Sequence, residues 1–174
     1  MKYTIHGPFE VRRQKTGLVD HGKEAKAVFW SEVKKIDEAL PDACGCYLFA
    51  IRAGGGIKPW YVGLAAKQAF EKECFAPQKI NIYNDVIAKG KGTPLLFLIA
   101  KRTPSDKFAR PGKNGYKDIE YLETFMIGAV LEKNTDLMNI KKTNYLRKMC
   151  VPCLINSPKR KPTNSEKEFE RVFV

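Results

Sequence analysis

Two short apolar runs separated by glycines lie near the centre of this 174-residue chain. The first is CGCYLFAI at residues 44–51, the second is WYVGL at residues 60–64, and Gly54-Gly55-Gly56 lies between them. Apolar and aromatic runs of this length are typical of strands, and glycine tolerates the backbone angles of a tight turn. The stretch 44–64 therefore predicts a β-hairpin.

The segments around this hairpin carry helical and strand patterns. Apolar residues recur at helical spacing over 24–40 and 117–133, and shorter helices are predicted over 66–74 and from Pro77 to Gly90 or Gly92. The run TPLLFLIA at 93–100 is continuously apolar, as in a strand buried on both faces. Residues 3–11 alternate weakly and could form a further strand. From the stronger patterns we predict an α+β fold with a small three-stranded antiparallel sheet flanked by helices.

The length suits one domain with a modest elaboration. We expect residues 1–41 to be an N-terminal extension with a helix, and 42–142 to be the main domain. Residues 143–174 then form a basic tail docked on that domain, because apolar residues return between Phe169 and Val174.

The chain carries 31 Lys and Arg against 19 Asp and Glu, so its formal net charge is +12. Such an excess attracts polyanions and speeds encounter with them, although many basic proteins bind nothing anionic. The sequence contains no apolar run of about 18 residues, and its N-terminus lacks the apolar core of a signal peptide. We expect a cytoplasmic protein with no membrane partner.

Four of the five cysteines occur as close pairs, Cys44 with Cys46 and Cys150 with Cys153. Two such pairs could together bind zinc, but the chain between them is much longer than in compact zinc sites. Cys46 also falls in a strand-like apolar run, where cysteine behaves as a small hydrophobic residue. We favour reduced, structural thiols and keep zinc as the alternative.

Glu123 is the most informative single residue for function. On a helical wheel of 117–133 it falls between Ile127 and Val130, whereas Glu120 points away from the apolar stripe of Leu122, Phe125, Met126, Ala129 and Val130. A carboxylate that borders a core must be paired, bind a metal ion or be protonated. The alternative is a partly exposed glutamate paired with a lysine.

Four short elements occur in a characteristic order. They are Gly45-Cys46-Tyr47, Tyr61-Val62-Gly63, Glu123 four residues before Ile127, and Leu137-Met138-Asn139. In this order, and with these strands and helices between them, the elements resemble the GIY-YIG nuclease family over residues 44–140. Each element alone is common, whereas the ordered set is fairly specific.

The resemblance implies a metal-dependent endonuclease that hydrolyses phosphodiester bonds of nucleic acid. Glu123 would bind a single divalent cation, Mg²⁺ or Mn²⁺, which would polarise the scissile phosphate. Tyr47 and Tyr61 would position or deprotonate the attacking water. Asn139 would hold local backbone or a tyrosine in place. Each tyrosine could instead be a strand residue packed on a helix, and Asn139 a helix-capping or turn residue.

Two features of the family are not found here. Many members carry an arginine on the helix after the second tyrosine element, but residues 70–75 contain none, so Lys67 or Lys72 would substitute, with Lys67 better placed. Members also often carry a histidine in this region, and none occurs between Gly63 and Gly92. The alternative is therefore a GIY-YIG-fold module that binds nucleic acid without cleaving it. A regulatory domain of unrelated fold is a third, weaker hypothesis.

Basic residues supply the candidate contacts to the nucleic-acid backbone, with DNA expected in preference to RNA. Within the domain these are Lys72, Lys79, Lys101 and Arg102. Further basic residues follow the matched stretch 44–140, namely Lys141, Lys142, Arg147, Lys148 and Lys159-Arg160-Lys161. Such contacts give affinity without sequence choice, and any one group could equally be a solvated basic face.

Overall fold

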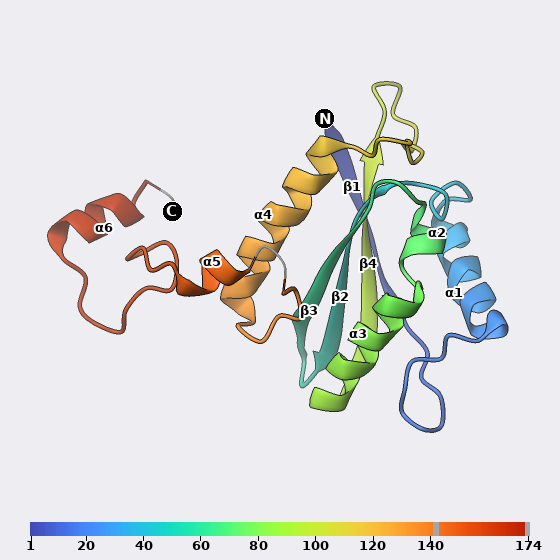
Figure 1. The fold of residues 1–174 in the computed structure, drawn as a ribbon, viewed down its shortest axis with the longest axis horizontal. Coiled ribbons are helices and arrows are strands. Elements are labelled where there is room, and N and C mark those ends of the chain that lie inside the picture. The colour runs from blue at the N-terminus through green and yellow to red at the C-terminus, as the bar shows by residue number, and fades with distance from the viewer. Residues whose placement is uncertain (141–142, 173–174) are drawn as a thin grey trace.

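The computed structural model describes residues 1–140 and 143–172 and is built around one antiparallel sheet (Figure 1). Its four strands lie in the order β1-β4-β2-β3, and every neighbouring pair is antiparallel. The strands are β1 (Lys2–Glu10), β2 (Gly45–Ala53), β3 (Gly56–Ala65) and β4 (Thr93–Arg102). With the helices on both faces of this sheet, the chain has the expected α+β architecture.

The expected number of strands was wrong, because the opening segment adds a fourth. β1 pairs with β4 from Lys2 opposite Arg102 to Glu10 opposite Leu95, and the register shifts between His6 and Phe9. That irregularity, together with the position of β1 at the edge of the sheet, explains the weak alternation of its sequence. The region 1–41 thus contributes a strand to the sheet as well as a helix.

β2 and β3 form the expected hairpin, with a turn at Gly54 and Gly55, where φ is positive. The pairing places Tyr47 opposite Gly63 and Phe49 opposite Tyr61. Because side chains alternate across a strand, Tyr47, Phe49 and Tyr61 all reach the same buried cluster, while Val62 belongs to the cluster on the opposite face.

The helices are α1 (Lys23–Ile36), α2 (Phe70–Glu73), α3 (Pro77–Lys89), α4 (Lys117–Lys133), α5 (Asn144–Lys148) and α6 (Asn164–Glu170). α1 ends four residues before the expected Leu40, because Asp37 is already extended. The helix expected over 66–74 is reduced to the single turn of α2, because the backbone is still extended at Ala69. α3 begins at Pro77, and α4 has the bounds predicted from its periodicity.

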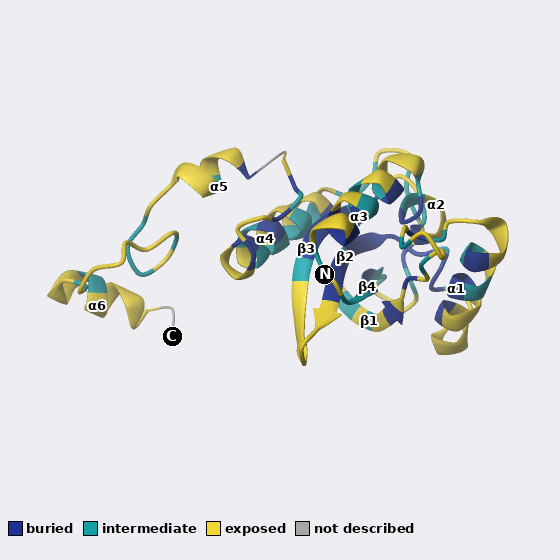
Figure 2. Ribbon diagram, turned by 90° about the horizontal axis from the view of Figure 1, so that it is seen from below, coloured by how far each residue is buried: buried dark blue, intermediate teal, exposed yellow. Residues whose placement is uncertain are grey.

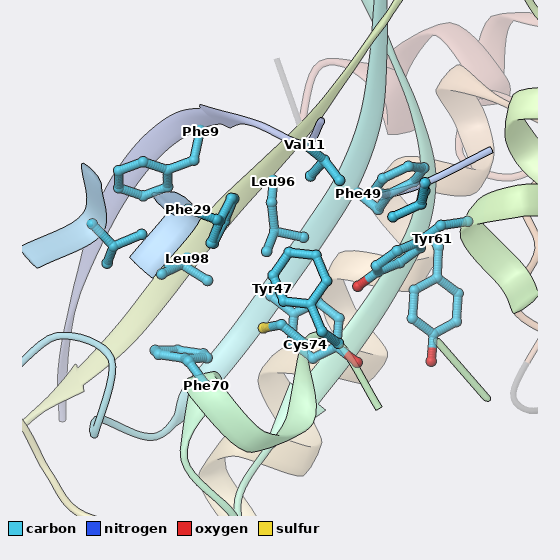
Figure 3. Packing of buried hydrophobic residues seen from close by; sticks show 14 of the residues in the cluster. Phe9, Val11, Phe29, Tyr47, Phe49, Tyr61, Phe70, Cys74, Leu96 and Leu98 are labelled. Atoms are coloured by element: carbon cyan, nitrogen blue, oxygen red, sulfur yellow. The ribbon is translucent and has the colours of Figure 1, made fainter. Parts of the chain in front are cut away.

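Helices cover both faces of the sheet. On one face, α1 and α3 pack against the strands in a cluster of aromatic and branched residues that includes Phe29, Phe49 and Leu96 (Figure 3). Tyr83 of α3 belongs to the same cluster. On the other face, α4 packs on β2 and β3 through Ile119 and Ile127. β3 therefore forms the edge of the sheet at which α3 and α4 lie on opposite sides.

The buried side of α4 differs from the predicted stripe. Ile119, Ile127 and Leu131 are buried, whereas Phe125 is 74% exposed and Ala129 is also exposed. Since apolar residues occur on several sides of this helix, its sequence periodicity marks the side that faces the sheet only poorly. Glu123 lies four residues from both Ile119 and Ile127, so it borders the buried side of the helix.

The tail leaves the body beyond α4 (Figures 1 and 2). Its first part is held to the body, because Leu146 packs beside Ile127 and Leu131 and Arg147 donates to the carbonyl of Leu137 at 2.7 Å. α6 buries no residue, and Phe169 is exposed. Lys141, Lys142 and the last two residues of the chain lie outside the described residues, as does the expected domain boundary at 142. Within the described part, no helix is long and apolar enough to cross a membrane.

Candidate functional site

A hollow of about 560 Å³ lies at the outer edge of β3, between α3 and α4. Strand β3, both helices and the segment after α4 contribute to its lining: Tyr61, Leu64, Lys79, Ile82, Glu120, Glu123, Ile127, Met138, Asn139 and Ile140. Four of the predicted site residues, from four separate segments of the chain, are thus brought to one place. They are Tyr61, Lys79, Glu123 and Asn139.

Lys79 supplies a positive charge to this hollow. Its Nζ donates a hydrogen bond to the hydroxyl of Tyr61 at 2.9 Å and lies 3.4 Å from a carboxylate oxygen of Glu73. Burial opposes the charge on Lys79, but the hydrogen bond and the negative partners outweigh it and raise the pKa of Lys79 above its usual value. Because Lys79 donates to the oxygen of Tyr61, the proton of that hydroxyl is left to point elsewhere.

Tyr47 does not reach the hollow. It is fully buried beneath Tyr61, with the two ring centres 6.2 Å apart (Figure 3). Its hydroxyl has no hydrogen-bond partner among the described residues. Burial raises the pKa of Tyr47 well above its usual value, and the neighbouring Tyr83 and Cys74 raise it further. In this arrangement the Tyr47 hydroxyl is shielded from solvent.

Glu123 and Glu120 lie on adjacent turns of α4 and both line the hollow. Glu123 is half-buried, while Glu120 is exposed. The described residues contain no group of three or more His, Cys, Asp and Glu side chains that could hold a metal ion. Mg²⁺ is commonly bound through one or two carboxylates and otherwise by water and phosphate oxygens. The carboxylates of this hollow fit a cation bound in that way.

Asn139 joins the segment after α4 to the sheet. Its side-chain oxygen accepts from the backbone N–H of Val62 at 2.9 Å, and its amide donates to the Val62 carbonyl at 2.7 Å. The side-chain amide of Asn134 donates to the carbonyl of Pro59 at 2.7 Å. The backbone N–H of Met138 donates to the carbonyl of Trp60 at 2.8 Å. Residues 134–139 therefore occupy hydrogen-bonding groups along the outer edge of β3 and form one wall of the hollow.

The cysteine pairs lie in different parts of the fold. Cys44 and Cys46 are buried under α4, and Cys46 donates to the carbonyl of Ile119 at 3.4 Å. Burial raises the pKa of Cys44 to about 11. Cys150 and Cys153 lie in the tail after α5. These four cysteines are not joined by disulfides, and the described residues form no zinc site shared between the two pairs.

Two predicted cations lie close in sequence to the second tyrosine element but do not line the hollow. Lys67 is exposed, and its side chain lies beside Gly115, a residue of the loop before α4. Lys72 is exposed on α2. The cation that contacts Tyr61 is Lys79, which we had assigned only to the nucleic-acid backbone.

Lys101 and Arg102 lie at the end of β4 and are engaged by the body of the protein. Lys101 forms an ion pair with Asp118 at the start of α4, and both side chains are largely buried. Arg102 lies 3.7 Å from the centre of the Phe108 ring. These contacts fix the loop before α4 to the sheet, and neither residue lines the hollow.

Sequence reasoning overlooked Glu73 and undervalued Lys79. The signal for Lys79 was present, because it lies four residues before Tyr83 and so borders the buried face of α3. For Glu73 the sequence offered no comparable signal, because α2 is a single turn whose direction depends on tertiary packing.

No family model matches this chain, and neither does any curated protein or solved structure. The likeness of the four sequence elements to GIY-YIG nucleases stays a prediction.

Proposed function

We propose that this protein is a metal-dependent endonuclease that hydrolyses phosphodiester bonds of nucleic acid in the hollow at the edge of β3. The observation that carries the proposal is that Tyr61, Lys79 and Glu123 line one hollow from β3, α3 and α4. A phenol, an ammonium group and a carboxylate suit phosphoryl chemistry, in which charge on the phosphate must be stabilised and a water oriented. The net charge of +12 favours a polyanionic substrate.

Each side chain has a distinct task in this proposal. Lys79 stabilises negative charge on the phosphate, as the arginine of related nucleases would. Tyr61, whose oxygen already accepts from Lys79, turns its own proton towards the attacking water or a phosphate oxygen. Asn139 keeps β3 and the wall of the hollow in register through its paired bonds to Val62. Tyr47 packs its buried ring beside that of Tyr61 and helps to hold it in position.

A divalent cation would be held by Glu123, with Glu120 one turn away. When bound, such a cation supplies electrophilic stabilisation of the phosphate and the leaving oxygen. Glu123 is half-buried, so its carboxylate has restricted freedom and loses little by being fixed.

One observation favours the second candidate, a module that binds nucleic acid without cleaving it. The Tyr47 hydroxyl is fully buried beneath Tyr61, so only one of the two tyrosines faces the hollow. A hydrolase of this design must work with Tyr61 alone or expose Tyr47 on binding substrate.

The test is cleavage of duplex, branched and single-stranded DNA and of RNA by the purified protein in Mg²⁺ or Mn²⁺. We expect metal-dependent cleavage that Glu123→Gln abolishes and that Lys79→Met lowers by about 10²–10³-fold. The matched controls are Glu132→Gln, an exposed glutamate on the same helix, and Lys67→Met, an exposed lysine outside the hollow. Both controls should cleave like the wild type.

The possible results separate the candidates. Binding without cleavage on every substrate would support the binding module. Equal cleavage by wild type and Glu123→Gln would indicate a contaminant and remove the proposed role of Glu123. Loss of activity in Lys67→Met but not in Lys79→Met would move the cationic role to Lys67.

A further inference from the structure

Lys79 and Glu73 form a largely buried ion pair, as Lys101 and Asp118 do elsewhere in the fold. The side chains are 15% and 16% exposed, whereas those of pairs such as Lys2–Asp106 are 64% exposed. Lys79 also lines the hollow, whereas Glu73, at the end of α2, is not among the residues that line it. The ammonium group thus faces the hollow and also contacts a carboxylate that is not part of its lining.

Such a pair presents little net charge to a ligand. An ammonium group has three donors, and Lys79 uses one for Tyr61 and has Glu73 within 3.4 Å. A phosphate that enters the hollow meets this carboxylate as well as the ammonium group. Since charges interact strongly where water is largely excluded, Glu73 and the phosphate compete for the same positive charge.

We infer that Glu73 is an internal stand-in for the substrate phosphate, holding Lys79 neutralised in the free protein until a phosphate anion displaces it. The inference rests on the proposed function for the identity of the phosphate, but the anion site at Lys79 can be tested without cleavage. The ligand class is a phosphate mono- or diester oxyanion. Removing the carboxylate of Glu73 should therefore leave the charge of Lys79 without its anionic partner and strengthen the binding of phosphate.

The experiment compares thermal unfolding of wild type and Glu73→Gln with and without inorganic phosphate. The variant leaves a largely buried ammonium group without its partner, so its midpoint should fall without phosphate. At a phosphate concentration of roughly ten times its dissociation constant, the unfolding midpoint of Glu73→Gln should rise by about 3–6 °C. The midpoint of the wild type should change by less than about 1 °C. Binding of a short oligonucleotide without metal should become roughly tenfold tighter in the variant.

The controls isolate the pair. Glu71→Gln removes an exposed carboxylate from the same turn and should respond like the wild type. The double variant Glu73→Gln/Lys79→Met should lose the phosphate response altogether. Should Glu73→Gln not fold, Glu73→Asp retains the charge while moving it away by one methylene, and it should show a smaller phosphate response of the same sign.

The outcomes are distinct. A folded Glu73→Gln that phosphate does not stabilise, or that binds the oligonucleotide more weakly, would overturn the inference and make Glu73 a residue that only orients Lys79. The full phosphate response in a protein that cleaves nothing would uphold the anion site while rejecting the nuclease proposal. Cleavage by the wild type without any phosphate response in the variants would support the nuclease proposal and reject the anion site.

Discussion

Tyr47 and Gly63 face each other across the β2–β3 hairpin, and each depends on the other. The phenol ring of Tyr47 lies over Gly63 so closely that a Cβ at Gly63 would overlap the ring. The absence of a side chain at 63 is thus what allows a tyrosine at 47 to be buried beside Tyr61. Packing alone gives this tyrosine and this glycine a reason to occur together in the two strands.

Gly63→Ala should destabilise the protein by about 1–3 kcal/mol, because the new methyl group must displace a fully buried ring. The matched control is Gly90→Ala, since a Cβ at Gly90 meets no atom within 4 Å. That control should change the free energy of unfolding by less than about 0.5 kcal/mol. Urea unfolding of both variants is the measurement, and equal stability of the two would show that Tyr47 does not occupy this position.

Asp118 gives the fold an acid-sensitive contact. Burial opposes its ionisation, but hydrogen bonds from Lys101 and from Tyr3, the latter at 2.8 Å, outweigh burial and lower the pKa of Asp118. The pKa of Asp118 is lower in the native protein than in the unfolded chain. The contact therefore contributes its full stabilisation at pH values above the usual carboxyl pKa of about 3.9. Its contribution is lost as pH falls from there through the lowered native value.

Asp118→Asn should therefore be clearly less stable than the wild type at about pH 6, and the difference should shrink at about pH 3. Denaturant unfolding at the two pH values measures this, with Asp85→Asn, at an exposed position of α3, as the control. A stability gap between wild type and Asp118→Asn that stays constant with pH would contradict the assignment.

At the scale of elements, the residues with the strongest patterns were predicted best. The bounds of α4 and the β2–β3 hairpin follow from regular periodicity and from glycines at the turn. β1 was not counted in the sheet, because an edge strand with a register shift has no regular alternation to read. The buried side of α4 was misjudged at Phe125, because a helix that is apolar on several sides leaves its orientation to tertiary contacts.

The candidate site was predictable to a similar degree. Tyr61, Glu123 and Asn139 line one hollow, as the order of the sequence elements led us to expect. The expectation that Lys67 or Lys72 replaces the arginine did not include Lys79, the cation that contacts Tyr61, since nearness in sequence does not indicate which lysine a helix turns inward. The burial of Tyr47 could not be read from sequence, because both faces of the strand carry apolar residues.

The segment 134–139 is the element whose attachment depends most on one side chain. Asn139→Ala removes both hydrogen bonds to Val62 and leaves a buried N–H and C=O without partners, at a cost of about 1–3 kcal/mol. Hydrogen exchange of the Val62 amide should accelerate in this variant. Asn144→Ala, at an exposed position of α5, is the control, and unchanged Val62 protection in Asn139→Ala would refute the anchoring role.

For the whole molecule, a group of exposed basic residues lies in the tail, outside the lining of the hollow. The body carries the hollow, whereas the tail carries exposed lysines, including Lys159 and Lys161, on a segment that extends beyond α4 (Figure 2). Arg160 between them is engaged with Glu166 at 2.6 Å. The tail can therefore add affinity for a polyanion without taking part in the site.

If the tail contacts phosphates, Lys159→Ala/Lys161→Ala should lower the slope of log affinity against log salt by about 1.8, which corresponds to two phosphate contacts. The charge-matched control is Lys23→Ala/Lys34→Ala on α1. Oligonucleotide binding over a series of salt concentrations measures both. Identical slopes in the two double variants would mean that the tail lysines do not touch nucleic acid.

The attachment of residues 134–139 along β3 has a consequence for solubility. An uncovered strand at the margin of a sheet is a template on which other chains can add, and this short stretch shields the margin beside the hollow. Residues 134–139 therefore both form a wall of the hollow and cover the edge strand against pairing with other chains. Any adaptation that opens the hollow wider by loosening this wall must also expose a strand to self-association, which limits how far the hollow can be enlarged from this side.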